Sequence, residues 1–108
     1  MRKVRLGTAG VDSGQLMITD PCYVRHFKTD YPQKIDPADN SYSLTGACST
    51  TINGLGGGLG GEMGVVFGTG GDGGFDVVAL IDDVDGVECV VAVSIILSGH
   101  PISYGGQK

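Results

Sequence analysis

Hydrophobic and polar residues alternate along several short segments of the chain, which is the pattern of half-buried β-strands. Residues 3–8 and 15–19 alternate in this way, and the clearest alternation of the front half runs over residues 41–52. There Tyr42, Cys48 and Ile52 share one face, and the Ser and Thr residues of the other face look solvated. We expect a strand in each of these three segments.

The back half continues in the same way. Residues 63–68 form a short apolar segment, and residues 75–81 are apolar on both faces apart from Asp76. Residues 87–97 alternate, with apolar residues on both faces. Apolar residues on both faces indicate central strands. Residues 82–86 end in glycine, which tolerates the positive φ of a hairpin connection. The hairpin over residues 75–97 is the most firmly predicted element.

Turn-forming residues separate these segments. Asp20 before Pro21 fits a helix N-cap with proline at the first helical position, so residues 21–27 are predicted to form a short helical turn. Residues 10–14 read as a turn, and residues 30–40 as a loop with one further turn at 36–39. Asn53-Gly54 is a tight-turn signal. Residues 54–61 hold six glycines, which predicts a mobile flap or a surface made of backbone.

Six strands, little helix and short connections predict an all-β fold with minor helix, in one domain over residues 1–108. An antiparallel meander is expected, either a sandwich or a partly open barrel. No window of about 18 apolar residues exists, so no membrane span is expected.

Charge is distributed unevenly along the chain. Residues 1–34 carry six bases and three acids, whereas residues 35–108 carry one base, Lys108, and nine acids. Net acidity argues against nonspecific nucleic-acid binding. The basic head, residues 1–34, could steer an anionic ligand or dock on an acidic protein; equally, folding could mix the two regions of charge.

Cysteine usage indicates a compartment. Cys22, Cys48 and Cys89 are an odd number at wide spacing, which is no disulfide framework. The basic N-terminus lacks the apolar stretch of a secretory signal. We therefore expect free thiols and a cytoplasmic protein.

Two glycine runs, residues 56–61 and 68–73, match the spacing G-x-G-x-x-G. A dinucleotide site needs that motif before a helix, and a β pattern follows both runs here. A P-loop needs a lysine that this region lacks. Consecutive glycine N–H groups could still form an anion-binding nest, although plain turn geometry is the favoured interpretation. No cofactor is expected.

Acidic side chains suggest calcium, but they are spread along the chain. A straight strand between Asp72 and Asp82 would hold them roughly 30 Å apart. Asp83 and Asp85 could hold a weak ion alone. A solvated acidic turn is the favoured interpretation, and no metal site is expected.

Cys22 and His26 form the only catalytic constellation we can assemble. On a helical turn they would share a face, Asp20 could orient the imidazole, and a helix N-terminus would lower the thiol pKa. The alternative is a buried, inert cysteine, which is the more common state of this residue.

Residues 13–23, SGQLMITDPCY, resemble the N-terminal signature of an uncharacterised group of small bacterial and phage proteins, SGxLxIxDPCY. That group carries a later Gly-Asp-Gly-aromatic loop, and residues 71–75, GDGGF, are similar with one extra glycine. The resemblance implies a mostly β fold and no known activity. If the two motifs meet in space they define one ligand site, made of Asp20, Cys22, Tyr23, Gly70, Gly71, Asp72 and Gly73. Capping by Asp20 is the favoured explanation of the first motif.

Three functions follow as hypotheses. The first is a non-enzymatic binding module, such as a phage-type inhibitor or sequestering protein, that recognises a partner protein or small anionic ligand through its glycine loops and basic head. The second is a small thiol enzyme using Cys22 and His26. The third is a structural subunit whose basic head joins the acidic body of the next copy in a homo-oligomer.

Overall fold

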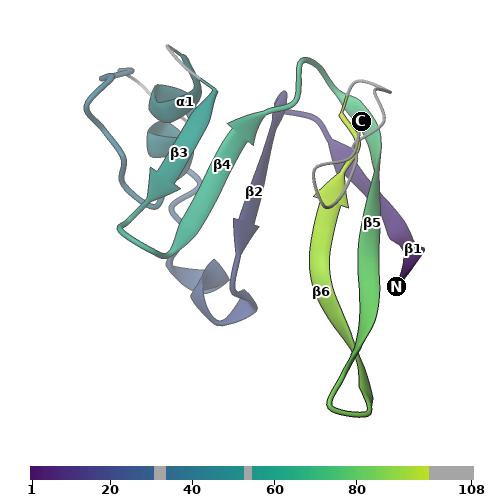
Figure 1. Cartoon of the computed structure of the whole chain (residues 1–108). Coiled ribbons are helices and arrows are strands. Elements are labelled where there is room, and N and C mark those ends of the chain that lie inside the picture. The colour runs from purple at the N-terminus through teal and green to yellow at the C-terminus, as the bar shows by residue number, and fades with distance from the viewer. Residues whose placement is uncertain (31–33, 53–54, 98–108) are drawn as a thin grey trace. The chain divides into compact units, whose positions relative to one another are not determined.

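The structure is a computed structural model that describes residues 1–30, 34–52 and 55–97. The chain forms two compact units (Figure 1). Unit 2 comprises residues 12–72, and unit 1 comprises the segments on either side of it. Regular structure in the described residues is mostly β, as predicted, with two antiparallel three-stranded sheets and a single short α-helix. No helix among the described residues is long and apolar enough to cross a membrane.

Unit 1 is a sheet with strand order β1-β5-β6, built from β1 (Arg2–Val11), β5 (Gly73–Val84) and β6 (Val87–Ile95). Strand β1 is longer than predicted, because its pairing with β5 continues through the expected turn as far as Val11. The prediction that β5 is central is confirmed. The same prediction for β6 is wrong, since β6 lies at an edge within the described part of the sheet.

The β5–β6 hairpin is confirmed, with a tighter turn than expected. Asp82 and Asp83 belong to β5, and only Asp85 and Gly86 form the turn. Their φ values are 52° and 83°. Positive φ at both central positions is the type I′ geometry, whose twist matches the twist of the flanking strands. Asp-Gly is among the pairs that adopt it most readily.

Unit 2 is a sheet with strand order β2-β4-β3 and two helical segments. Its strands are β2 (Gln15–Thr19), β4 (Gly64–Gly68) and β3 (Gly56–Leu59). Its helical segments are the 3₁₀-helix η1 (Pro21–His26) and the α-helix α1 (Leu44–Ile52). Because β2 pairs with β4 and β1 with β5, the strand order is not that of a simple meander; only β3–β4 and β5–β6 are hairpins.

The predicted strand over residues 41–52 is wrong, because most of this segment forms α1. Ser43 is the N-cap: its Oγ accepts a hydrogen bond of 2.9 Å from the N–H of Gly46, the third helical residue. Buried positions include Ala47 and Ser49, on the face that was expected to be solvated. Most residues of this segment are Ser, Thr, Ala, Cys and Gly, which are small and of intermediate hydrophobicity. The two faces of the predicted strand therefore differ little in hydrophobicity.

The glycine run over residues 54–61 is ordered where it is described. Residues 56–59 form β3 and pair with β4, which corrects the expectation of a mobile flap. Glycine is required where α1 and β4 approach the strand. A Cβ on Gly57 would lie 3.0 Å from Thr50 Cγ2, and one on Gly56 would lie 2.1 Å from the carbonyl oxygen of Val66. The tight turn expected at Asn53-Gly54 lies outside the described residues.

The core of unit 2 is a cluster of buried side chains between α1, β3 and β4. Tyr42, Ala47, Leu59 and Val66 form it, with partly buried Met17, Phe27 and Met63 packed around them. Leu59 and Val66 are 0% and 1% exposed. This cluster fixes the elements that surround the site described next.

Candidate functional site

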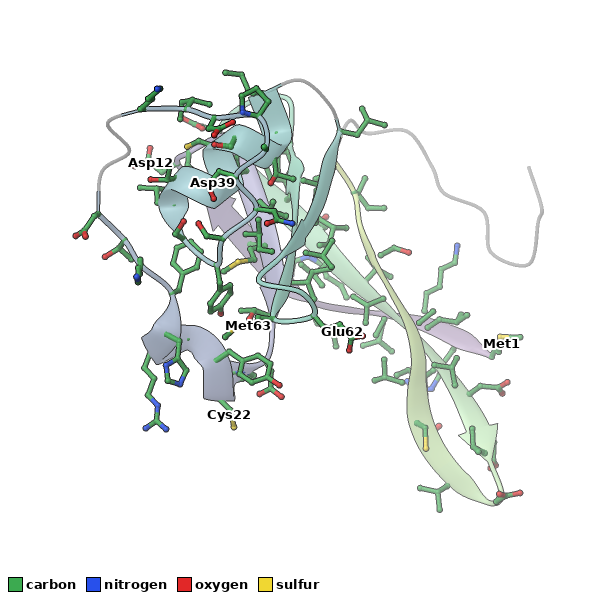
Figure 2. The ribbon with its side chains drawn as sticks, turned by 90° about the vertical axis from the view of Figure 1, so that its left-hand side faces the viewer. Met1, Asp12, Cys22, Asp39, Glu62 and Met63 are labelled. Carbon is green, nitrogen blue, oxygen red and sulfur yellow. The ribbon has the colours of Figure 1, made fainter. Side chains whose placement is uncertain are left out.

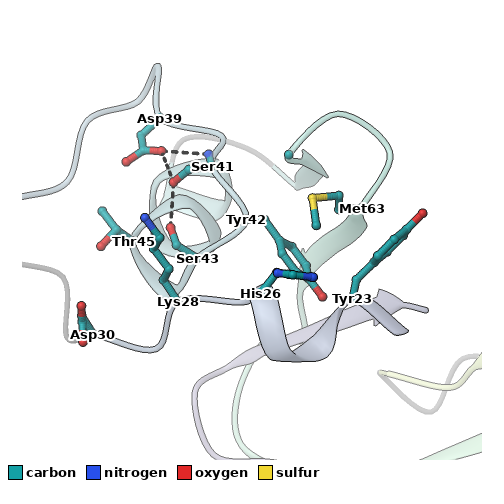
Figure 3. Close-up of a pocket in the computed structure, with 11 residues that line it drawn as sticks. Tyr23, His26, Lys28, Asp30, Asp39, Ser41, Tyr42, Ser43, Thr45 and Met63 are labelled. Atoms are coloured by element: carbon teal, nitrogen blue, oxygen red, sulfur yellow. Dashed lines mark hydrogen bonds between the residues drawn. The ribbon is translucent and has the colours of Figure 1, made fainter. Parts of the chain in front are cut away.

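A hollow of about 830 Å³ opens in unit 2 beside the start of α1 (Figure 3). One side is polar and the other is aromatic and apolar. The polar side holds Lys28, Asp30, Asp39, Ser41, Ser43 and Thr45. The other side holds Tyr23, His26, Tyr42 and Met63, and Gly60 completes the lining.

The aromatic side is set by η1. The Asp20 carboxylate accepts a hydrogen bond of 2.8 Å from the Cys22 N–H, and Pro21 occupies the first turn, which confirms the predicted cap and helical turn. The cap fixes where η1 starts, and the two η1 residues Tyr23 and His26 line the hollow. The Tyr23 side chain remains open to solvent, with the residue 40% exposed.

Lys28 is held against the start of α1 by its backbone. Its N–H donates to the carbonyl of Tyr42 at 3.3 Å, and its carbonyl accepts from the N–H of Leu44 at 2.7 Å. These two bonds make a parallel bridge between Lys28 and Ser43. The lysine side chain therefore runs along the polar side of the hollow (Figure 3).

The polar side is organised by a short chain of hydrogen bonds (Figure 3). Asp39 Oδ1 accepts from the Ser41 N–H at 2.9 Å and from the Ser41 hydroxyl at 2.7 Å. The Ser41 and Ser43 hydroxyl oxygens lie 2.7 Å apart. The hydrogen bonds from the backbone and then the hydroxyl of Ser41 stabilise the carboxylate and lower the pKa of Asp39 below its ordinary value.

Tyr42 forms the floor and joins the hollow to the core. Thr19 Oγ1 donates to the Met63 carbonyl at 2.8 Å, so in its 2.7 Å contact with the Tyr42 hydroxyl the tyrosine is the donor. The Tyr42 ring meets Phe27 edge to face, with centroids 5.1 Å apart. A Cβ on Gly60, which has φ +59°, would lie 2.9 Å from Tyr42 Cβ. This floor is therefore rigid and closely packed.

The charges of the hollow are of both signs and are not paired with one another. Within the described ranges, Lys28 forms no ion pair, although Asp30 and Asp39 line the same hollow. Lys28 and Asp30 are exposed and Asp39 is partly buried. A ligand entering the hollow therefore meets an ammonium group and two carboxylates.

Of the predicted ligand-binding residues, only Tyr23 lines this hollow. Of the predicted catalytic residues, only His26 does. Asp20 caps η1 and lines a neighbouring hollow of about 390 Å³, together with Tyr23 and Met63. The thiol of Cys22 is exposed and points away from unit 2 (Figure 2), so the expectation of a buried cysteine is wrong. All three thiols are free, as expected.

The helical type of η1 weakens the Cys22–His26 pairing. Residues four apart share a face in an α-helix, but in a 3₁₀-helix of three residues per turn they are about 120° apart. His26 lines the large hollow and Cys22 does not. The helical type of η1 therefore does not place Cys22 and His26 on one face.

The structure does not bring the two motifs of the expected ligand site together. Gly70, Gly71 and Asp72 follow β4 beside Gly14, where the Thr69 N–H donates to the Gly14 carbonyl at 2.9 Å. This is the start of β2, whereas Asp20 follows its end. The five residues of β2 separate the two by roughly 16 Å. Gly73, the last residue of that expected site, begins β5 in unit 1.

The acidic turn and the first part of the basic head, residues 1–11, both lie in unit 1. Among the described residues, no three His, Cys, Asp or Glu side chains gather as metal ligands, at Asp83 and Asp85 or elsewhere. Arg2 pairs with Glu88 at 3.0 Å and Arg5 with Asp76 at 3.1 Å. The charges of the head and the acidic body are thus partly mixed by folding.

Sequence reasoning missed most of the lining of the large hollow. The sequence patterns place Asp39 in a loop and Ser41 and Ser43 in a strand. Serine is, however, a preferred N-cap residue, and Ser43 caps α1. Leu44, Ala47, Cys48 and Thr51 recur at i, i+3, i+4 and i+7, which is the helical signal that was available. No sequence pattern marks Lys28 as a lining residue, because its position in the hollow depends on backbone pairing with residues 42–44.

Comparison with protein-family models, with curated proteins and with solved structures finds no match to this chain. The geometry of unit 2 is therefore the basis for the functional argument.

Proposed function

We propose that this protein is a non-enzymatic binding protein that takes a small molecule into the large hollow of unit 2. The observation that carries the proposal is the hollow itself, about 830 Å³ with one polar and one aromatic side. Small-molecule sites are concave spaces of about 300–1,000 Å³, with apolar walls and a few polar groups that orient the ligand. This hollow has that size and that mixture of groups.

The rigid floor supports the same function. Tyr42 is 7% exposed and is fixed by a hydrogen bond, a ring contact and a glycine turn. A preformed floor lowers the entropic cost of binding, because few side chains must be ordered when the ligand arrives. Such a protein acts by holding its ligand, as a sequestering protein or an inhibitor does, and not by converting it.

The other two hypotheses receive less support from the geometry. The thiol enzyme needs Cys22 and His26 on one face, and η1 does not provide it. The oligomeric subunit needs a basic head free to meet another copy, and two of its six bases, Arg2 and Arg5, already pair with acids of the same chain.

The experiment is an NMR titration of the full chain with a library of amino acids, nucleotides, sugars and aromatic acids. We expect one class to shift amide signals of residues 23–28, 39–45 and 60–63, while signals of β5 and β6 stay in place. The variant Thr45→Phe should place a bulky ring in the hollow, obstruct the ligand and reduce or abolish these shifts. Thr8→Phe, on an exposed position of β1, is the matched control and should leave them unchanged.

Failure has a clear form. If no compound in the library moves the signals of the lining residues, or if Thr45→Phe binds as well as the wild type, the hollow is not a binding site.

A further inference from the structure

We infer that the ligand of this hollow is a small zwitterion of the α-amino acid kind with an apolar side chain; this inference rests on the proposed function. The cationic end would lie against the polar side at Asp39, and the anionic end at Lys28. The apolar side chain would contact Tyr23 and Met63. Three features of the hollow lead to this assignment.

The first feature is the direction of the hydrogen bonds on the polar side. An ionised carboxylate only accepts, so the Ser41 hydroxyl spends its one hydrogen on Asp39. In the contact between the two serines, Ser43 must then donate to Ser41. Ser43 also accepts from the Gly46 N–H. Both hydroxyl hydrogens are used inside the chain, so Asp39, Ser41 and Ser43 present acceptors to a ligand.

The second feature is Lys28. Its ammonium group offers three donors and has no carboxylate within ion-pair distance in the described part of the chain. It runs along the acceptor side without closing on Asp39 (Figure 3). A ligand that carries an anionic group within a few bonds of a cationic group would pair with Lys28 and with Asp39 at the same time.

Ligands of a single charge fit less well. An anion that pairs with Lys28 would also face the carboxylates of Asp30 and Asp39, and a cation that pairs with Asp39 would face Lys28. Like charges placed together in a site reduce affinity and serve to reject the wrong ligand. A zwitterion offsets both repulsions, because its ammonium group pairs with Asp39 while its carboxylate pairs with Lys28; the Asp30 carboxylate then remains exposed to solvent.

The third feature is the apolar side of the hollow. The Tyr23 ring is open, and the Met63 thioether lies beside it (Figure 3). Thioethers and aromatic rings adapt to apolar groups of varied shape. The hollow should therefore favour amino acids with larger apolar side chains over glycine.

The test is calorimetric titration of the full chain with leucine and phenylalanine, followed by three changes to the better ligand. The methyl ester removes the negative charge, N-acetylation removes the positive charge, and glycine removes the side chain. We expect each of these to bind at least tenfold more weakly than the zwitterion.

Two variants assign the two ends. Lys28→Met should weaken the zwitterion tenfold or more and remove the preference for the free acid over the ester. Asp39→Asn should remove the preference for the free amine over the N-acetyl form. Lys34→Met and Asp12→Asn change the same charges at exposed positions outside the lining and should bind as the wild type does. Thermal melts confirm that each variant is folded.

The outcomes separate the two levels of the argument. If the ester and the N-acetyl form bind as tightly as the zwitterion, or if another class from the NMR library binds instead, the zwitterion assignment is wrong and the binding function stands. If no compound binds at the hollow, both are wrong.

Discussion

The two units use apolar residues in opposite ways. Unit 1 is rich in valine, yet only Val11 and Ala79 are buried among its described hydrophobic residues, and Val87, Val90 and Val93 are more than half exposed. Unit 2 is rich in glycine, yet it holds the buried cluster around Leu59 and Val66. Apolar composition alone therefore does not locate the core. Close backbone approach, which glycine permits, lets a few large side chains be fully enclosed.

The largest effect is expected from Gly46→Ala in α1. A Cβ at this position would lie 2.0 Å from the carbonyl oxygen of Ser41, in the backbone segment just before the helix. We expect a loss of roughly 4 kcal/mol or more in the free energy of unfolding. Gly68→Ala is the control, since its Cβ would meet nothing within 4 Å and its φ is ordinary. Chemical denaturation measures both, and equal stability of the two variants would contradict this view of unit 2.

The next test compares the cores directly. Leu59→Ala removes a side chain that is 0% exposed and should cost about 3 kcal/mol, because it leaves a cavity. Val93→Ala in β6, which is 55% exposed, should cost less than about 0.5 kcal/mol. Denaturation midpoints of the two variants check this. Similar losses would mean that unit 1 depends on apolar packing as much as unit 2 does.

A smaller effect of opposite sign is expected at Ser49. Its hydroxyl is buried without a hydrogen-bond partner among the described residues. Ser49→Ala removes that unsatisfied group and raises helix propensity, so we expect a gain of about 1 kcal/mol. Thr45→Ala, on the same helix and partly exposed, also raises helix propensity but removes no buried unsatisfied hydroxyl, so its gain should be smaller. Thermal unfolding would contradict the prediction if Ser49→Ala melted below the wild type.

The ion pair of Arg5 and Asp76 in unit 1 should matter least among the stabilising contacts. Both side chains are more than half exposed, at 59% and 53%. Exposed pairs contribute about 0.5 kcal/mol and are screened by salt. A double-mutant cycle with Arg5→Ala and Asp76→Ala at low and high salt measures the coupling. A coupling above about 2 kcal/mol would show that unit 1 relies on its charges.

A pH titration sharpens the comparison from the side of unit 2. The folded-state pKa of Asp39 is lowered, so its contribution to stability is present above the ordinary aspartate pKa and is lost as pH falls through the folded value. The difference in unfolding free energy between wild type and Asp39→Asn should therefore shrink as pH falls below about 4. Denaturation at a series of pH values checks this, and a constant difference would exclude the effect.

Local signals in the sequence predicted local structure well. Asp20-Pro21 predicted the cap and turn of η1, and the alternation over residues 15–19 predicted β2 with its bounds. The connection predicted over residues 82–86 located the hairpin, although its turn is only Asp85-Gly86. Each depends on interactions between neighbours in the chain. The helix α1 was missed because its cap was read as part of an alternating pattern.

The candidate site was harder to predict, because its residues meet only after folding. Tyr23 and His26 stand in motifs that predict a different site, and Lys28 reaches the polar side only through backbone pairing with residues 42–44. Strand β3 was missed for a related reason: Gly56, Gly57 and Gly58 have no side chains to show a period, and pairing with β4 supplies their order.

The hydrogen bond between the Thr69 N–H and the Gly14 carbonyl joins the two ends of unit 2, which are 55 residues apart in the sequence. Strands β1 and β5 lie on either side of this closed segment in the sequence. Joining them across an unstructured tether would carry a loop-closure entropy that grows with tether length. Once unit 2 has folded, that tether is reduced to a few residues. Pairing of β1 with β5 should thus be the late step of folding, after residues 12–72 have become an insert with adjacent ends.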